Sequence, residues 1–236
     1  MRLGIMQPYF LPYIGYYSLI KHTDKWIVFD TAQFIRHGWI ERNRILKPVQ
    51  DWQYISVPLH KHSRDTAIKE ISIRDEDWKN KIIRQFAHYK RAPCYNEVMN
   101  VLHNCFDIKT DSITQLNVHI LKCTCNYLQI DFGYEIFSEM NLEIEPVADA
   151  GEWALNISKA YGATTYINPA GGAGLFDREK FKLAGIDLTF LEMPLTHYSQ
   201  QRTAFEPGLS IIDVMMFNSV DEINAMLDNY KLTSGE

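Results

Sequence analysis

The chain has 236 residues, of which 46% are hydrophobic and 22% are charged. This composition is that of one compact soluble domain with a sizeable core, and it excludes disordered, collagen-like and coiled-coil proteins. The 24 Lys and Arg residues against 29 Asp and Glu residues give a formal net charge of -5, so we expect no DNA partner. Four cysteines without a CxxC pair indicate reduced thiols rather than a disulfide scaffold or structural zinc.

The N-terminal segment has to be distinguished from a signal peptide. Residues 3–20 carry no charge and follow Arg2. However, Gln7 and Pro12 interrupt the apolar run, and no small-residue cleavage site follows it. No other segment reaches the roughly 20 apolar residues of a membrane span. We therefore expect the N-terminus to belong to the fold, and a cytoplasmic protein without a membrane span.

The start of the chain predicts a strand, a loop, a helix and a second strand. Residues 2–6 form a short apolar run, residues 13–20 have helical spacing, and residues 26–29 form a second apolar run. In a parallel sheet the carboxyl ends of two such strands meet, and ligands bind there. Residues 7–13 and Asp30 are therefore expected to face one another.

The rest of the chain predicts a single α/β domain over residues 1–236, mainly a parallel Rossmann-like sheet with helices on both faces and C-terminal helices. Residues 53–59 and 67–73 predict a small, hairpin-like β excursion, and residues 76–130 a helical insertion. The expected helices are 77–89, 95–106, 112–128, 153–161, 177–184, 210–217 and 219–230, and the later strands are 134–137, 164–167 and 186–191.

Four polar or aromatic residues follow the first predicted strand. Tyrosine and glutamine side chains at a strand end can position a ligand by hydrogen bonding and stacking. The alternative is a proline-braced turn whose tyrosines fill the core. These candidate binding residues are Gln7, Tyr9, Tyr13 and Tyr16.

Two arginines follow Trp39 at a spacing of two. In an extended chain Arg42 and Arg44 share one side, and a guanidinium fork holds phosphate or carboxylate in parallel hydrogen bonds. The alternative is an exposed edge strand kept soluble by charge. Asn43 points the other way, and we predict a functional role for it as well as for Arg42.

Residues 168–174 form a glycine-rich loop before a predicted helix. Its unobstructed amides are suited to an anion or a sugar, which makes Asn168, Gly171 and Gly172 candidates. The alternative is a plain connection in which both glycines need a positive φ.

Further candidates follow the last predicted strand. A histidine side chain ordinarily titrates near neutral pH, so His197, close to Tyr198 and Gln200, could act as a general base. Ser210 either caps a helix in a capping box with Asp213 or binds phosphate at the helix start.

One pair of histidines has metal-ligand spacing. His60 and His62 could share one face of a strand, but no third ligand is identifiable, so we predict no metal site.

Several sequence strings resemble the WbqC-like protein family, in their order and separations, over nearly the whole chain. Near the start these are Gln7-Pro8-Tyr9-Phe10-Leu11-Pro12-Tyr13-Ile14-Gly15-Tyr16, Gln33-Phe34, Gly38-Trp39 and Arg42-Asn43-Arg44-Ile45. Downstream they are Asn168-Pro169-Ala170-Gly171-Gly172, Leu175-Phe176, Tyr198-Ser199-Gln200 and Phe205-Glu206-Pro207-Gly208-Leu209-Ser210-Ile211-Ile212-Asp213.

The resemblance implies a role in surface-polysaccharide (O-antigen) biosynthesis. The activity it implies is an aminoacyl transferase or amide ligase that joins glycine to a nucleotide-linked or lipid-linked amino sugar. Such acyl transfer needs a base, donors for the developing oxyanion and cations for phosphate. On this reading His197 or Asp30 is the base. Arg42 and Arg44 hold phosphate, and Asn43 or the glycine-loop amides donate to the oxyanion.

The N-terminus is also distantly similar to HIGH-superfamily nucleotidyltransferases. Residues 13–16 occupy the place of the HxGH-type tetrad, with tyrosines instead of both histidines, and Gln33-Phe34 follows the next strand. The similarity implies nucleotide binding beside Gly15 and Gln33, with ATP and Mg as the means of activating the acyl group. Glycyl-tRNA is the other donor considered. The alternatives are a nucleotidyltransferase-like enzyme with another acceptor and a non-catalytic nucleotide-sugar binding protein.

Overall fold

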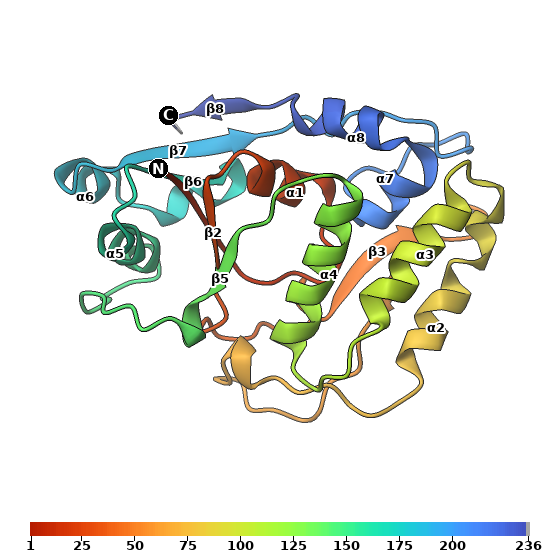
Figure 1. Cartoon of the computed structure of the whole chain (residues 1–236), viewed down its shortest axis with the longest axis horizontal. Helices are drawn as coiled ribbons and strands as arrows, with labels where there is room; N and C mark the ends of the chain where they lie inside the picture. The colour runs from red at the N-terminus through yellow and green to blue at the C-terminus, as the bar shows by residue number, and fades with distance from the viewer. Residues whose placement is uncertain (235–236) are drawn as a thin grey trace.

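The computed structural model describes residues 1–234, and it contains a six-stranded sheet in the order β5-β2-β1-β6-β7-β8 (Figure 1). Every neighbouring pair is parallel except β7 and β8, which are antiparallel. The predicted mainly parallel α/β sheet is therefore confirmed. Its strands are β1 (Arg2–Met6), β2 (Lys25–Val28), β5 (Tyr134–Ile136), β6 (Thr165–Pro169), β7 (Asp187–Glu192) and β8 (Lys231–Thr233).

Helices cover both faces of this sheet, as Figure 1 shows. On one face α5 and α6 pack over Leu3 and Ile5, and on the other face α1, α7 and α8 belong to a second, larger core that includes Trp26 and Val28. Successive strand residues point to opposite faces, so one short strand serves both cores. The helices are α1 (Ile14–Lys21), α2 (Trp78–Gln85), α3 (Tyr95–Phe106), α4 (Ile113–Tyr127), α5 (Glu152–Tyr161), α6 (Arg178–Leu183), α7 (Ile211–Phe217) and α8 (Val220–Leu227).

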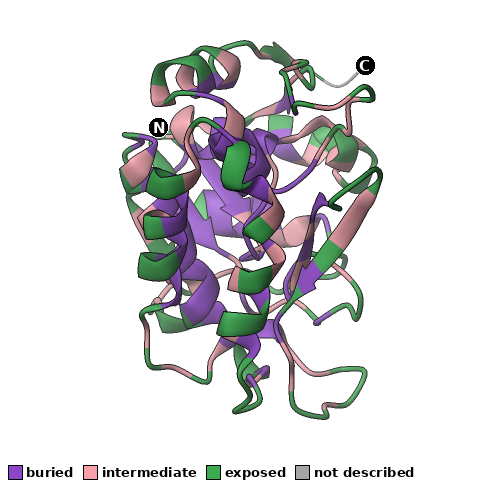
Figure 2. Cartoon of the chain, turned by 90° about the vertical axis from the view of Figure 1, so that its right-hand side faces the viewer, coloured by how far each residue is buried: buried purple, intermediate pink, exposed green. Residues whose placement is uncertain are grey.

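Buried residues concentrate on the sheet and on the inward sides of the helices (Figure 2). Several helices begin where the sequence predicts, because a short polar side chain accepts a backbone N–H there. Ser112 accepts from Gln115 N at 3.3 Å, and Asp177 accepts from Glu179 N at 3.0 Å. Gly162 ends α5 in the left-handed conformation with φ 72°.

The β excursion differs from the prediction. The antiparallel hairpin joins β3 (Arg42–Leu46) to β4 (Trp52–Ser56), whereas residues 67–73 contain a short 3-10 helix, Ile68–Glu70, with isolated bridges on either side. The sequence pattern missed β3 because its Arg-Asn-Arg start does not resemble an apolar strand. Three helices, α2 to α4, follow this hairpin in the chain before β5.

The strand order reverses between β1 and β6. From β1 the chain crosses through α1 to β2 on one side, while β6 continues through α6 to β7 on the other side. In open α/β sheets ligands bind in the crevice outside the carboxyl ends of the strands at such a point. In residues 1–234 no helix is both long enough and apolar enough to cross a membrane.

Candidate functional site

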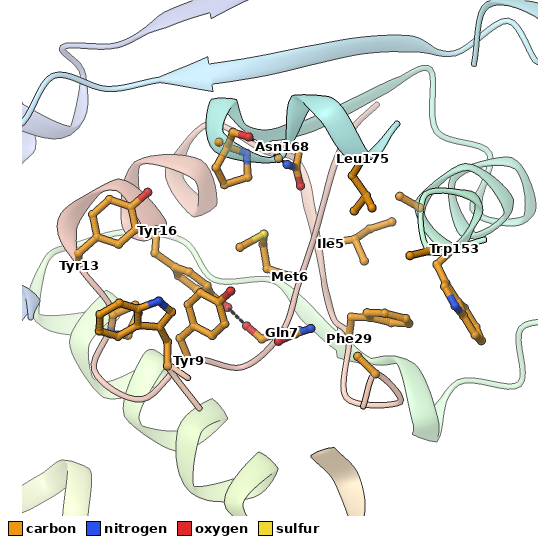
Figure 3. Close-up of a pocket in the computed structure, with 18 of the residues that line it drawn as sticks. Ile5, Met6, Gln7, Tyr9, Tyr13, Tyr16, Phe29, Trp153, Asn168 and Leu175 are labelled. Carbon is orange, nitrogen blue, oxygen red and sulfur yellow. Dashed lines mark hydrogen bonds between the residues drawn. The ribbon is translucent and has the colours of Figure 1, made fainter. Parts of the chain in front are cut away.

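A cavity of about 960 Å³ lies at the carboxyl ends of β1 and β6 (Figure 3). This volume is at the upper end of the range for small-molecule sites. The lining comes from the loop after β1, from β3, from the glycine-rich segment after β6 and from the chain before α7. Its residues are Ile5, Met6, Gln7, Tyr9, Pro12, Tyr13, Tyr16, Phe29, Thr31, Ala32, Gln33, Trp39, Asn43, Arg44, Ala150, Trp153, Ala154, Tyr166, Asn168, Pro169, Gly171, Gly172, Leu175, Phe176, Leu195 and Gly208.

The loop of residues 7–12 is held by its carbonyl groups. Tyr16 Oη donates to the Gln7 carbonyl at 2.8 Å, as Figure 3 shows. Asn117 Nδ2, from α4, donates to the Pro8 carbonyl at 2.8 Å. Ile211 N donates to the Pro12 carbonyl at 2.8 Å. The backbone that presents Gln7, Tyr9 and Tyr13 to the cavity is thus fixed from several elements before any ligand arrives.

Asn43 is part of the same bracing. It is buried, and its Nδ2 donates to the carbonyls of Phe10 at 3.0 Å and Leu11 at 2.8 Å. Its Oδ1 accepts from Arg44 N at 2.8 Å. Leu11 has a positive φ of 44°, an unfavourable conformation for leucine that these bonds help to maintain. The Asn43 amide hydrogens are therefore engaged by the loop and not by the cavity.

Arg44 is the one residue with a formal charge among the cavity-lining residues within 1–234. Its guanidinium carbon lies 5.5 Å from the Trp39 ring centroid and 5.2 Å from that of Trp52. Nη2 donates to the Gly208 carbonyl at 3.1 Å. A guanidinium carries five N–H donors, so Arg44 keeps donors free for an anionic ligand.

Arg42 does not share this position. Its guanidinium lies 4.0 Å from the Tyr54 ring centroid and donates to the His37 carbonyl, and Arg42 is absent from the cavity lining. Both arginines lie on β3 at a spacing of two, so this stretch is extended, which is the condition under which the two side chains share one side. However, only Arg44 reaches the cavity, so the structure does not bring the two guanidinium groups together there.

The glycine-rich wall is built by close approach rather than by positive φ. Among glycines in residues 1–234, only Gly162, Gly185 and Gly208 have positive φ. The alternative interpretation, a connection in which Gly171 and Gly172 need positive φ, is therefore wrong in that respect. A Cβ on Gly172 would lie 2.3 Å from Asn168 Nδ2. Asn168 in turn accepts from Tyr166 Oη at 2.9 Å. Residues 170–175 form a 3-10 helix.

The end of the cavity away from Tyr9, Tyr13 and Tyr16 is apolar and aromatic. Figure 3 shows Phe29, Trp153, Leu175 and Ile5 on the side away from the tyrosines, with Met6 and Gln7 between the two ends. The ring centroids of Phe29 and Trp153 are 5.3 Å apart in a tilted pair. Such a surface accepts a planar or apolar group.

The lining has no side chain that titrates near neutral pH within residues 1–234: it contains no Asp, Glu, His, Lys or Cys. Burial raises the pKa values of Tyr9 and Tyr13 above the ordinary tyrosine value. Both phenols therefore stay protonated at neutral pH and can donate hydrogen bonds.

The two predicted bases lie outside the cavity lining. The Asp30 carboxylate is buried and accepts from Ser138, with Oδ1 at 3.1 Å from the backbone N and Oδ2 at 2.6 Å from Oγ. It therefore fixes the chain after β5. His197 is exposed and packs on Phe205, with ring centroids 4.4 Å apart.

Tyr198 and Gln200 meet at a buried carboxylate instead of in the cavity. Asp213 Oδ1 accepts from Tyr198 Oη at 2.5 Å and from Gln200 Nε2 at 3.0 Å, and Oδ2 accepts from Tyr89 Oη at 2.6 Å. Burial raises the pKa of Asp213, while these donors oppose the shift.

The predicted capping box at the start of α7 is wrong in its second half. Ser210 Oγ caps α7 by accepting from Ile212 N at 3.3 Å, but the Asp213 side chain belongs to the buried cluster just described.

Gly15 has a local role in the structure. A Cβ there would lie 2.4 Å from Cε2 of Tyr13, so the glycine leaves room for the ring that lines the cavity. Gln33 lines the cavity and donates from Nε2 to the Arg64 carbonyl at 2.8 Å. The predicted nucleotide contact at Gly15 stays a prediction.

The donor set of the cavity does not fit a bound magnesium ion. Mg²⁺ prefers carboxylate and other hard oxygen ligands, and the described lining supplies no carboxylate. Residues 1–234 also contain no group of three or more His, Cys, Asp or Glu side chains placed to hold a metal.

Sequence reasoning missed several residues that shape the cavity. The aromatic pair Phe29 and Trp153 comes from segments far apart in the chain, and Asn117 braces the loop from the middle of α4. The sequence does contain one indication of the role of Asn117, which stands among apolar residues of a predicted helix. A buried amide needs hydrogen-bond partners, so such a residue is expected to hold another segment in place.

Comparisons with known proteins give matches that span nearly the whole chain. The family model described as "WbqC-like protein family" matches residues 7–225. The chain is similar to "Uncharacterized protein Rv1507c" of Mycobacterium tuberculosis (strain ATCC 25618 / H37Rv), with 27% identity over 221 residues that cover 92% of this chain and 93% of that protein. No solved structure matches the chain. The matched family model covers nearly the whole chain, and the protein therefore belongs to the WbqC-like protein family.

Proposed function

We propose that the cavity binds a nucleotide-linked amino sugar and that the protein transfers an aminoacyl group, glycine by family resemblance, to its amine in surface-polysaccharide biosynthesis. The observation that carries the proposal is the division of one switch-point cavity into two ends. In one part of the lining Arg44 lies beside Trp39, and in another part Phe29 lies beside Trp153.

Each end suits a different part of such a ligand. Arg44 forms charge-assisted hydrogen bonds to a diphosphate, and its planar fork matches two phosphate oxygens. The aromatic end stacks a planar nucleobase, and Gln7 between the ends offers an amide to base or sugar. The cavity volume of about 960 Å³ is sufficient for a ligand of this size.

The proposed reaction proceeds by positioning rather than by a protein base. The amine attacks in its neutral form, having lost the ammonium proton to water. Its nitrogen bonds to the carbonyl carbon of an activated ester and the ester C–O bond breaks. One of the two N–H protons moves to the departing oxygen, which leaves as an alcohol, and the other stays on the amide nitrogen. The phenols of Tyr9 and Tyr13, kept protonated by raised pKa values, donate to the developing oxyanion.

The acyl donor in this proposal arrives already activated. The described lining offers no carboxylate for Mg²⁺ and only one cationic side chain, Arg44, for a triphosphate, so the proposed reaction does not use ATP. ATP-dependent activation stays a prediction from the sequence, as does delivery by aminoacyl-tRNA.

A second candidate is a nucleotide-sugar binding protein without turnover. It is favoured by the lack of any group titrating near neutral pH in the described cavity lining. A binding protein needs shape, stacking and charge, whereas most acyl transferases also position a base.

Calorimetric titration with UDP-glucosamine tests the binding step. We expect saturable binding to the wild-type protein and a loss of about 10-fold to 100-fold in Arg44→Ala, because a hydrogen bond to a charged group contributes about 1.5–3 kcal/mol. Arg42→Ala is the matched control, since Arg42 lies on the same strand with its guanidinium outside the cavity lining. Equal losses in both variants, or no binding to the wild type, would contradict the proposal.

Turnover separates the two candidates. The purified protein is incubated with UDP-glucosamine and an activated glycine ester, and the amide product is measured by mass spectrometry. We expect a rate that rises with pH until the sugar amine is neutral, and no product with UDP-glucose. Tight binding without product formation would favour the binding protein.

A further inference from the structure

Residues 193–209, here named the strap, connect β7 to α7 without a helix or strand. The strap contributes Leu195 and Gly208 to the cavity lining. It also accepts the hydrogen bond of Arg44, at the Gly208 carbonyl. The position of the strap therefore affects the one charged side chain that lines the described cavity.

The strap is tied to Asp213, which is fully buried. Its carboxylate has three donors: Tyr198 Oη at 2.5 Å and Gln200 Nε2 at 3.0 Å from the strap, and Tyr89 Oη at 2.6 Å. A buried carboxylate is costly unless donors compensate for its lost hydration. This requirement makes the cluster one cooperative unit.

One arm of the cluster reaches β3. The hydroxyl of Tyr89 accepts from Leu46 N at 2.9 Å, and Leu46 lies two residues after Arg44. Ser210 N, just before α7, donates to the Arg44 carbonyl at 2.9 Å. The backbone that carries Arg44 is thus attached to the start of α7 at two points.

The other arm closes the strap upon itself. Gln200 Nε2 donates to the Glu206 carbonyl at 2.9 Å, and Gln200 Oε1 accepts from Glu206 N at 2.8 Å. Two residues later Gly208, with φ 65°, turns its carbonyl to Arg44 Nη2 at 3.1 Å. A positive φ favours glycine at this turn.

We infer that Asp213 is a positioning residue for Arg44: one buried carboxylate holds both the strand that carries the guanidinium and the strap that accepts its hydrogen bond. The inference rests on the proposed function only in that Arg44 binds the anionic part of the ligand. Asp213 is absent from the cavity lining and acts through Arg44.

The first test needs no ligand. Arg44 Nε is buried and has no hydrogen-bond partner, so the NMR signal of its N–H reports on the surroundings of the guanidinium. The signal is assigned by its loss in Arg44→Lys. In Asp213→Asn we expect the signal to shift and its hydrogen exchange to accelerate at least about tenfold, because the guanidinium loses its fixed surroundings. Asp221→Asn, an exposed carboxylate on α8, is the matched control and should leave the signal unchanged. An unchanged signal in Asp213→Asn would overturn the inference.

Tyr198→Phe provides a milder variant if Asp213→Asn does not fold. It removes one donor and keeps the ring, so we expect a smaller change of the Arg44 signal in the same direction. An unchanged Arg44 signal in folded Tyr198→Phe would then overturn the inference.

A double-mutant cycle with UDP-glucose supplies the second test. Asp213→Asn should weaken binding about tenfold with Arg44 present and have no further effect in Arg44→Ala, because coupled residues are not additive. If Asp213→Asn weakened UDP-glucose binding equally with Arg44 present and in Arg44→Ala, Asp213 would have only a general structural role. That result would overturn the inference. If Arg44→Ala alone changed nothing, the proposed function would fail, while the NMR signal would still decide the role of Asp213.

Discussion

The loop of residues 7–12 and the glycine-rich segment of residues 170–175 line the same cavity, but their backbones are held differently. The loop receives donors from α1, α4, β3 and α7. In residues 1–234, no side chain donates a hydrogen bond to a carbonyl of the glycine-rich segment. The first wall has its carbonyls held by tertiary hydrogen bonds, whereas the second is held by packing, as where a Cβ on Gly151 would lie 2.3 Å from the Leu175 carbonyl oxygen.

This difference indicates a division of labour in ligand binding. A wall whose carbonyls are satisfied from distant elements costs little to order when a ligand binds, because the ordering has already occurred on folding. A short 3-10 segment with open space around Gly171 and Gly174 can adjust to the ligand. We therefore expect the loop to set ligand orientation and the glycine-rich segment to adapt to it.

The largest effect is expected from Asn43→Ala. The substitution leaves the buried carbonyls of Phe10 and Leu11 without their donor. We expect a loss of about 2–4 kcal/mol in the free energy of unfolding, measured by urea denaturation. Gln33→Ala, which removes an exposed side-chain donor, is the control and should change stability by less than about 0.5 kcal/mol. A small effect in Asn43→Ala would show that the loop does not depend on this bracing.

A smaller effect is expected from Gly172→Ala. The new Cβ would lie 2.3 Å from Asn168 Nδ2, so the amide must move or the segment must shift. Such overpacking costs about 1–3 kcal/mol. Gly174→Ala is the matched control, because nothing lies within 4 Å of its added Cβ. If thermal unfolding shows equal stabilities for the two variants, the close approach at Gly172 does not constrain the wall.

The smallest effect is expected from pH. Burial raises the pKa values of Tyr9 and Tyr13, so these phenols remain neutral below their folded-state values and lose protons only as pH rises through them. The affinity for UDP-glucose, measured by calorimetry, should therefore change less than about twofold between about pH 6 and 9. A transition near neutrality would instead indicate that a histidine such as His197 reaches the ligand.

Much of the fold could be predicted from local patterns. Apolar runs, helical spacing and cap residues identified β1, α1, β2 and most later elements, and the βα alternation indicated the parallel sheet. The same patterns failed at β3, where tertiary contacts stabilise a strand whose first residues are Arg-Asn-Arg. Local propensity carries no information about such contacts.

The candidate site was only partly predictable. The loop after β1, Arg44 and the glycine-rich segment were found because strand ends meet at one edge of a parallel sheet. The sequence could not show which of Arg42 and Arg44 reaches the cavity, because both lie on the same strand at a spacing of two. The tertiary structure decides this: the Arg42 guanidinium packs on Tyr54, and the Arg44 guanidinium lies near Trp39.

By itself, the sequence determined the order and type of most elements and the family, because these depend on short-range spacing and on ordered motifs. Only the tertiary structure decided which polar residues face the cavity and which hold the scaffold. Three polar residues illustrate this, each in or near a family motif: Asn43, Asp30 and Asp213. Each is buried and makes its hydrogen bonds to other parts of the protein. The physical reason is that a buried polar group must find partners, and those partners come from segments far away in the chain.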